Sequence, residues 1–448
     1  MVVMHINNHF NSLDIPMRSI LRYVFLLGLI NALTLQIASA QFASWVDKIV
    51  NTPPPGVGCF TARYPDEGWT QRSCAWTASD LQKARLPSIS EQATQPASKT
   101  VGSGNDWTLS APNTIKQAVG TFKNMSGVSS VYDETTLGHQ TPGAFSLQMN
   151  TNLKEWPCGG PTGDFDCDAA TQFVIERSDS GATLFIEWLL DWPGDCPNGW
   201  SAGLHTRFGS ICYKNSDGIS VNTWNWDIRD VNALTLYGYL ARGPLKLDGT
   251  VAIFGDTAFT VTGQNGIFDM SDAWNTVEYN IFGAGNGSKA VLNSGSALGV
   301  KVGAWYDSSS SVPPLCKEGG FTGEQNNLNL GPCIVVNSDP TKSDSYPYIL
   351  FTEYLGTPEA PQVFMPQNGA QIPIGTLNIN GGGTSNATVK ASLDQTQICE
   401  TNVSLVEVWF CPSVQITTPG NHLLTVVQTA ADGKRSPPTY VSFFTPKP

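Results

Sequence analysis

The amino-acid sequence predicts an all-β protein: a large disulfide-stapled β-sandwich or jelly roll, followed by a second, smaller β domain. Three observations predict this fold class. Many short runs alternate apolar and polar residues, which is the period of a half-buried strand. Turn dipeptides rich in Gly, Asn and Asp separate these runs. Charged residues make up only 14% of the chain, and this composition favours strands and turns over exposed helices.

The expected strands follow one another along residues 128–355. In the first, Phe145, Leu147 and Met149 lie on one face and polar residues alternate with them on the other. Dipeptides such as Ser180-Gly181 and Asp248-Gly249 mark turns between strands. Because almost no helix signal interrupts the pattern, a sandwich or jelly roll follows. The further strands are expected over residues 171–176, 183–192, 234–240, 250–254, 258–262, 274–282, 297–304 and 348–354.

Ten cysteines fall into five pairs whose members lie 9 to 17 residues apart. An even number of cysteines in an exported chain predicts a disulfide framework, and pairing of neighbours is the simplest of many connectivities. Each short bridge adds up to ~3 kcal/mol if it acts by restricting the unfolded chain. No Cys-x-x-Cys motif is present, which argues against zinc. The pairs are Cys59/Cys74, Cys158/Cys167, Cys196/Cys212, Cys316/Cys333 and Cys399/Cys411.

The N-terminal residues have the three parts of a secretory signal. Arg18 and Arg22 form the basic start, a mostly apolar stretch follows, and Ala38-Ser39-Ala40 is a cleavage site. We therefore expect a secreted or periplasmic protein that is cleaved near Ala40. No later stretch reaches the ~20 apolar residues of a spanning helix, so no membrane span is expected.

The net charge of the chain indicates which classes of partner it can bind. A net charge of −12 gives an acidic surface that repels phosphate backbones, so nucleic acid is not expected as a partner. We expect a monomer.

Four segments are expected along the chain. Residues 1–40 are the signal peptide with an N-terminal extension, and residues 41–125 are an irregular leader. This leader is either an integral arm or a removable pro-segment that blocks a site, and the sequence leaves both open. Residues 126–356 are the main β-sandwich, and residues 357–448 are the second β domain, about the size of one immunoglobulin-like module.

Two motifs in the second domain carry a resemblance. The strand Val406-Glu-Val-Trp409-Phe-Cys411 is followed by Gly420-Asn-His-Leu-Leu-Thr-Val426. This order is similar to the immunoglobulin-like modules of bacterial secreted and surface proteins, in which a Trp-Ser-Cys strand precedes Gly-x-His-x-Leu-Thr-Val. Phe410 stands here in place of the serine. The resemblance implies a spacer, adhesion or stabilising module without catalytic residues, and a bacterial source.

The main domain contains Cys59-Phe-Thr-Ala-Arg-Tyr-Pro65, Phe145-Ser-Leu-Gln-Met-Asn150, Val277-Glu-Tyr-Asn-Ile-Phe-Gly283 and Phe321-Thr-Gly-Glu-Gln-Asn-Asn-Leu328. These pieces resemble a group of uncharacterised bacterial secreted proteins, and that resemblance implies no activity.

The strand over residues 183–192 carries the most informative polar residues. Its even-numbered residues from Leu184 to Trp192 must face the core, which leaves Glu187 on the other face. By the same alternation, Trp274, Glu278 and Asn280 share one face of their strand, and Gln148 lies on the polar face of its own. A concave face that joins Gln148, Glu187, Trp274 and Glu278 would form a ligand groove.

Two catalytic chemistries fit such a face. The stretch Phe185-Ile-Glu187-Trp188 is similar to the Glu-Trp strand of glutamic peptidases, which are β-sandwich enzymes. That resemblance implies Glu187 as general base and Gln148 as the group that polarises the carbonyl or holds the oxyanion. In a glycosidase, Glu187 and Glu278 would instead be the acid and the nucleophile or base. The alternative to both is that these carboxylates are ordinary hydrogen-bonded strand residues.

Two loops hold further candidates. The spacing of Asp164, Asp166 and Asp168 is that of alternate oxygen ligands in a calcium loop, so calcium is the one cofactor that the sequence suggests. Between Cys316 and Cys333, Glu324, Asn326 and Asn327 cluster amide and carboxylate groups suited to sugars. Together with Trp274 and Asn280 they are the expected ligand-binding residues.

The sequence therefore supports two functions. The first is an extracellular binding protein for a glycan or a surface protein, indicated by 13 tryptophans, low charge and many amides. The second is a secreted hydrolase active in the acid range, a glutamic-type endopeptidase before a glycosidase.

Overall fold

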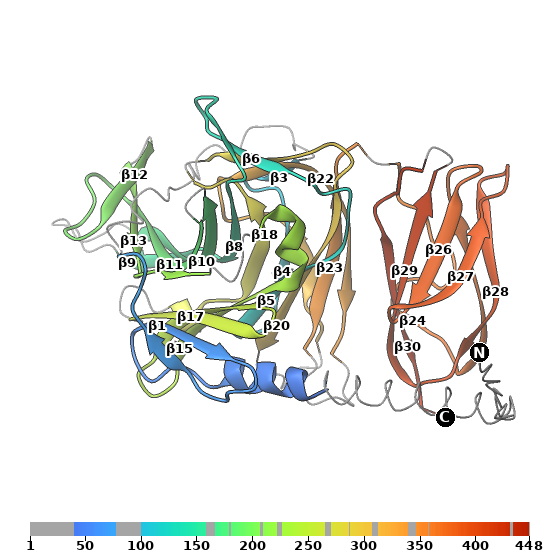
Figure 1. Cartoon of the computed structure of the whole chain (residues 1–448), viewed down its shortest axis with the longest axis horizontal. Helices are drawn as coiled ribbons and strands as arrows, with labels where there is room; N and C mark the ends of the chain where they lie inside the picture. Colours follow the sequence, from blue (N-terminus) through green and yellow to red (C-terminus); the bar gives the residue numbers. More distant parts are fainter. Residues whose placement is uncertain are drawn as a thin grey trace, which may run out of the picture.

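The computed structural model describes residues 40–77, 100–157, 166–178, 181–206, 209–221, 226–264, 270–285, 287–306, 312–338, 346–356, 358–430 and 433–447. The expected signal peptide before Ala40 lies outside these residues. Strands make up most of the regular structure of the described chain, which confirms the predicted all-β class (Figure 1). The described helices are one over residues 40–51 and two short 3-10 helices, η2 (Ile228–Ala233) and η3 (Met270–Asp272). No helix among the described residues is long and apolar enough to cross a membrane.

The first sheet of the main unit has thirteen strands. Its path is β2 (Thr70–Arg72), β1 (Gly58–Arg63), β17 (Thr257–Gln264), β16 (Leu247–Phe254), β15 (Leu234–Arg242), β5 (Ile115–Ser126), β20 (Ala297–Tyr306), β23 (Tyr348–Tyr354), β22 (Gln325–Val336), β19 (Lys289–Leu292), β6 (Val131–Glu134) and β7 (Gln140–Pro142), with β3 (Thr100–Gly102) paired to β22.

The second sheet has ten strands. Its path is β12 (Ser201–Thr206), β13 (Gly209–Asn215), β11 (Gly181–Trp192), β10 (Asp166–Ser178), β8 (Phe145–Thr151), β18 (Thr276–Phe282), β4 (Trp107–Ser110) and β21 (Leu315–Glu318), with β14 (Ile219–Ser220) paired to β11 and β9 (Lys154–Pro157) paired to β10.

The main core lies between these two sheets. Alternate residues of the second sheet, including Leu147, Phe173 and Ile186, are fully buried in it. Two glycines of the first sheet allow a close approach. A Cβ on Gly238 would lie 2.2 Å from the ring of Phe173, and a Cβ on Gly120 would lie 2.3 Å from the ring of Tyr279. Aromatic rings of one sheet therefore rest directly on the backbone of the other.

The first sheet also curls over the opposite face of the second. Its end strands β22, β19 and β6 contact β18 and β8 from the side away from β15 and β17 (Figure 1). Asp133 in β6 accepts a hydrogen bond from the Ala284 amide at 2.9 Å, and Asn326 in β22 donates to the Ile281 carbonyl at 3.0 Å. The polar face of β8 and β18 is consequently enclosed rather than open to solvent.

The expected irregular leader over residues 41–125 is in large part integral to the main unit. A helix over residues 40–51 packs Trp45 and Ile49 against the outer face of the first sheet (Figure 1). β1 pairs with β17, and β5 pairs with β15 on one side and β20 on the other. The sequence did not reveal this because both β5 partners lie more than a hundred residues downstream in the chain.

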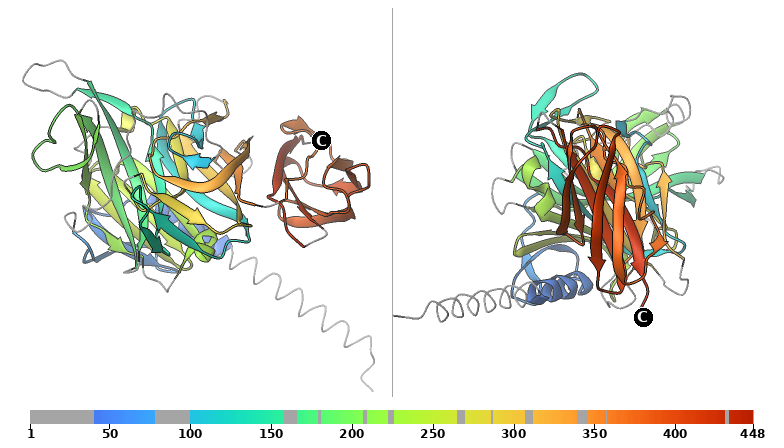
Figure 2. Two further views of the ribbon diagram at one scale, coloured as in Figure 1. Left: turned by 90° about the horizontal axis from the view of Figure 1, so that it is seen from above. Right: turned by 90° about the vertical axis from the view of Figure 1, so that its right-hand side faces the viewer.

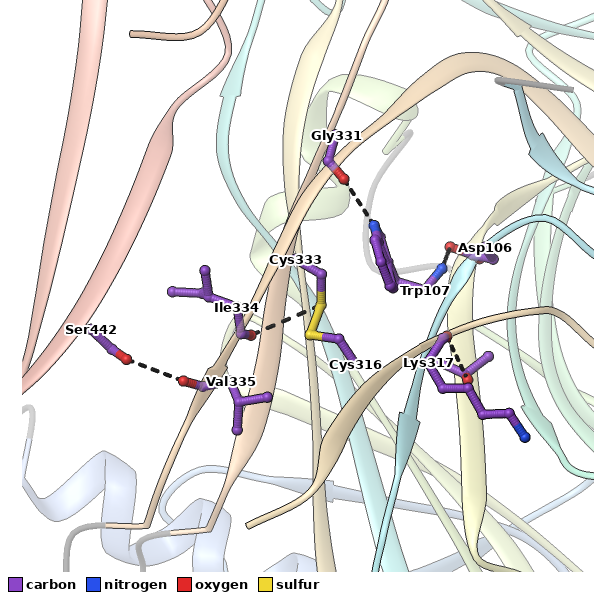
Figure 3. The surroundings of a disulfide bond; sticks show 10 residues. Asp106, Trp107, Cys316, Lys317, Gly331, Cys333, Ile334, Val335 and Ser442 are labelled. Atoms are coloured by element: carbon purple, nitrogen blue, oxygen red, sulfur yellow. Dashed lines mark hydrogen bonds between the residues drawn. A yellow bond between two sulfur atoms is a disulfide. The ribbon is translucent and has the colours of Figure 1, made fainter. Parts of the chain in front are cut away.

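Four of the five expected disulfides are described with both cysteines. They join Cys59 to Cys74, Cys196 to Cys212, Cys316 to Cys333 and Cys399 to Cys411, as neighbour pairing predicted. Figure 3 shows the Cys316–Cys333 bridge, which ties β21 of the second sheet to β22 of the first. Beside it, the Trp107 indole donates to the Gly331 carbonyl at 2.8 Å, so the two sheets are linked twice at this edge.

Of the fifth expected pair, Cys158 with Cys167, the structure describes only Cys167. Cys167 is disulfide-bonded and lies near the start of β10, where it is 3% exposed and belongs to the main core. Its expected partner Cys158 lies outside the described residues, so this pairing stays a prediction. The sequence placed Cys167 in a loop, and the structure corrects this: its side chain packs in the core from a strand, because β10 begins earlier than the alternation predicted.

The C-terminal residues form a separate small two-sheet unit beside the main one (Figure 2). One sheet has the order β24 (Ala370–Gln371), β30 (Thr439–Thr445), β29 (Gly420–Thr429), β26 (Thr388–Leu393), β27 (Thr396–Asn402), and the other pairs β25 (Gly375–Gly382) with β28 (Val408–Ile416). Trp409 and Cys411, from the strand that carries the resemblance, are buried in its core. Ser442 donates to the Val335 carbonyl of the main unit at 3.1 Å.

Candidate functional site

A row of polar residues crosses the enclosed face of the second sheet. Strand pairing places Glu278, Asn150, Gln172, Glu187 and Asn215 side by side on five neighbouring strands, each opposite the next. All five side chains are buried, with exposed fractions of 5% or less. The alternation that puts Ile186 and Phe173 in the core puts these residues on the opposite face.

The next row along the same strands changes character halfway. Asn280 lies opposite Gln148, Gln148 opposite Val174, and Val174 opposite Phe185. Its first two members are amides, and its last two form a small apolar patch that contacts Trp76. The face thus holds carboxyl, amide and apolar groups within two rows.

Several buried polar atoms of this face have no hydrogen-bond partner among the described residues. Native proteins leave few buried polar atoms unsatisfied, so a group of them on one surface points to a ligand or to water. The unpartnered atoms are Gln148 Oε1, Asn150 Oδ1, Gln172 Nε2, Glu187 Oε1 and Glu278 Oε1.

The carboxyl groups of the face repel one another and are enclosed. Burial, and then the charges of Glu324 and Glu176, raise the pKa of Glu187 well above its usual range. Burial is also the main cause that raises the pKa of Glu278 to about 7. Glu324 from the curled end influences both glutamates and accepts a hydrogen bond from Gln148. Part of this group therefore stays protonated in weak acid.

A second carboxyl–amide network adjoins the first at β18. The Asn280 amide donates to Asp106 at 3.0 Å and also to Glu353, and Asn326 donates to Glu353 at 3.4 Å. Glu278 accepts from the Asn150 amide at 2.9 Å. Burial raises the pKa of Glu353 to about 8, and burial followed by the Glu278 and Glu353 charges raises the pKa of Asp106.

The structure brings Gln148, Glu187, Glu278, Asn280, Glu324 and Asn326 together around this face. Trp274 is a correction, because its ring lies in the main core near Phe173 rather than on the polar face. β18 begins only at Thr276, so the alternation does not extend back to Trp274. Asn327 exchanges two hydrogen bonds of 2.8 Å with the Leu292 backbone and thereby links β22 to β19.

The two expected calcium ligands that the structure describes lie in a strand and not in a loop. Asp164 lies outside the described residues, whereas Asp166 and Asp168 lie in β10, where Asp168 is opposite Glu155. Cys167, which separates them, is buried in the main core. Among the residues that the structure describes, no three His, Cys, Asp or Glu side chains are grouped in a way that would hold a metal ion.

Sequence reasoning placed Asn150 on the polar face of its strand without assigning it a role, and it missed Gln172 in the first row and Asp106 and Glu353 in the second network. For Gln172 a signal was present. The Ser180-Gly181 dipeptide in the sequence predicts a turn there, and counting back along both strands from the Ser178–Gly181 pair places Gln172 opposite Glu187. Asp106 and Glu353 lie in strands or loops far apart in the sequence, and no local pattern joins them to β18.

A search of protein-family models finds none that matches this chain. A search of curated proteins finds no significant match.

Proposed function

We propose that this chain is a secreted hydrolase active in weak acid, of the glutamic-peptidase type, in which Glu187 and Gln172 are the catalytic pair. One observation carries the proposal. Glu187 and Gln172 stand directly opposite each other on paired strands, both are buried, and Glu187 Oε1 and Gln172 Nε2 have no partner among the described residues. Directly opposed side chains have Cβ atoms ~4.5–5.5 Å apart, so the carboxyl group of Glu187 and the amide group of Gln172 are close enough to act on the same small group.

The pair supplies the two groups that amide hydrolysis needs. In the molecules in which Glu187 is ionised, a fraction that grows with pH because its pKa is raised, Glu187 removes a proton from water and the water oxygen forms a bond to the carbonyl carbon. The electron pair of the C=O bond moves to the carbonyl oxygen, which accepts a hydrogen bond from Gln172 Nε2. The electron pair of the oxyanion then re-forms the C=O bond, the C–N bond breaks with its electrons on nitrogen, and the proton held by Glu187 passes to the leaving amine, which returns Glu187 to its ionised form.

Gln148 takes a supporting position in this arrangement. It lies one row and two strands away from Glu187 and hydrogen-bonds Glu324, whose charge acts on Glu187. Gln172 is therefore better placed than Gln148 as the amide partner of the base.

The spacing of the glutamates disfavours a glycosidase. Glu187 and Glu278 are three strands apart, which is ~14 Å at ~4.8 Å per strand. Paired glycosidase carboxyls lie only ~5–9.5 Å apart.

A second candidate function is binding of a glycan on the same face without catalysis. The observation in its favour is the set of unpartnered amide atoms on Gln148, Asn150 and Gln172, because planar amides bind sugar hydroxyls through paired hydrogen bonds. A role of the C-terminal unit as a spacer, which its resemblance to immunoglobulin-like modules implies, is compatible with either function.

Incubation of a denatured protein mixture with the purified protein from pH 3 to pH 7 tests the proposal. We expect cleavage by the wild type, and a loss of at least about 10²-fold in Glu187→Gln and in Gln172→Met. Asp191→Asn is the matched control, since Asp191 is on the same face of β11 but near the far end of the strand from the apolar patch. Cleavage that survives in Glu187→Gln would overturn the assignment. No cleavage at any pH would favour glycan binding, with a glycan array as the next measurement.

A further inference from the structure

Trp76 lies on the candidate catalytic face. Its side chain is half-buried and contacts Val174 and Phe185, the apolar patch in the second row. It belongs to the segment after β2, which precedes the main strands of this sheet in the chain by about a hundred residues. The patch is therefore covered in cis by a side chain from a distant part of the sequence.

The patch is next to the catalytic pair of the proposed function. Phe185 is two residues before Glu187 in β11, and Val174 is two residues after Gln172 in β10, so each lies on the same face. Two residues of a strand span ~6.6 Å, which is also the separation of alternate side chains in an extended peptide. The patch thus has the position of a pocket for a side chain that flanks the cleaved bond.

The segment of Trp76 is fixed by its backbone and by a disulfide. The Trp76 amide donates to the Gly218 carbonyl at 3.2 Å, and the Gly218 amide donates back at 2.9 Å. Two residues earlier, Cys74 is joined to Cys59 in β1. These two attachments fix the backbone at Trp76, so the indole can leave the patch only by rotation about its side-chain bonds.

We propose that the Val174–Phe185 patch is the subsite for a bulky apolar or aromatic side chain of a peptide substrate, and that Trp76 occupies it as a built-in competitor. This inference rests on the proposed function and adds its substrate class. A substrate reaches the pair only in the fraction of molecules whose Trp76 has left the patch, and that fraction sets the apparent affinity.

The test compares the full chain with Trp76→Ala and with a matched control, Trp69→Ala. Trp69 lies just before β2 and is also half-buried, but it packs with the helix on the outer face of the first sheet. Cleavage of peptides that differ only in the residue flanking the cleaved bond is measured at pH 5. We expect Trp76→Ala to cleave peptides with Phe, Trp or Leu at that position at least about tenfold faster than the wild type, and Trp69→Ala to match the wild type.

A second variant, Phe185→Ala in the Trp76→Ala background, should lose the preference for aromatic over small residues at that position. Cleavage by Trp76→Ala at the wild-type rate and with the wild-type preference would overturn the inference while the proposed function stood. If no variant cleaves any peptide, the proposed function fails separately, and binding of N-acetyl-tryptophanamide, measured by ligand-observed NMR, then decides. Binding to Trp76→Ala that is weakened by Phe185→Ala supports the subsite, and equal binding to all variants rejects it.

Discussion

The two faces of the second sheet are buried to the same degree but differ in chemistry. On the inner face, Leu147, Phe173 and Ile186 bring only carbon atoms into the core. On the opposite, enclosed polar face, which is the outer face of the second sheet, Glu187 and Gln172 are no more than 3% exposed and keep polar atoms without partners among the described residues. The difference teaches that burial alone does not identify a stabilising residue. One face of the same strands stabilises the fold, and the other holds groups that the fold itself does not satisfy.

The largest effect is expected on the inner face. Phe173→Ala removes a fully buried ring that rests on Gly238, so we expect a loss of about 3–5 kcal/mol in the free energy of unfolding. Urea denaturation with the disulfides intact measures it. Gln172→Ala, one residue away but on the outer face, is the control and should cost about 1 kcal/mol or less. Equal losses in the two variants would remove the contrast between the faces.

An intermediate effect is expected from pH. The folded pKa values of Glu278 and Glu353 are about 7 and about 8, above the ordinary 4.5. As pH rises from 4, the unfolded chain loses these protons first, so the folded state binds more protons and the free energy of unfolding falls. This stability is complete below about pH 4 and is lost as pH passes 7 to 8, by an amount on the order of a few kcal/mol.

Thermal unfolding between pH 4 and pH 9 measures this dependence. Glu353→Gln keeps the shape of the side chain but removes one titrating group, so its melting temperature should fall less steeply with pH than that of the wild type. A melting temperature that rises from pH 4 to pH 8 would contradict the raised pKa values of Glu278 and Glu353.

The smallest effect is expected for Gln172→Met. This substitution conserves approximate volume and removes the unpartnered Nε2, so the free energy of unfolding should stay within about 1 kcal/mol of the wild type or rise. Urea denaturation measures it, and the cleavage assay on the same sample should show the loss of activity. A large destabilisation would mean that Gln172 serves the fold instead of a substrate.

The sequence predicted the strands and their faces well, because alternation is local. Glu187 and Gln148 were found in this way, and the Ser180-Gly181 turn also contained the register that places Gln172 opposite Glu187. Alternation failed at Trp274, where a 3-10 helix ends and the strand has not yet begun. It gave nothing on the curled end of the first sheet, because the contacts of β22 and β19 with β18, and of β6 with β8, join segments that lie far apart in the sequence.

The position of β5 bears on how the protein assembles. β5 contains residues 115–126, yet its neighbours are β15 and β20, and β20 ends at Tyr306. The centre of the first sheet cannot form until those later strands have been synthesised, and closing such long loops makes folding slow. Early hairpins such as β10–β11 can form alone, but both of their faces stay exposed to solvent until the first sheet has formed. A chain with this topology depends on exposed strand edges remaining unpaired for a long interval, which makes aggregation the principal hazard of its biosynthesis.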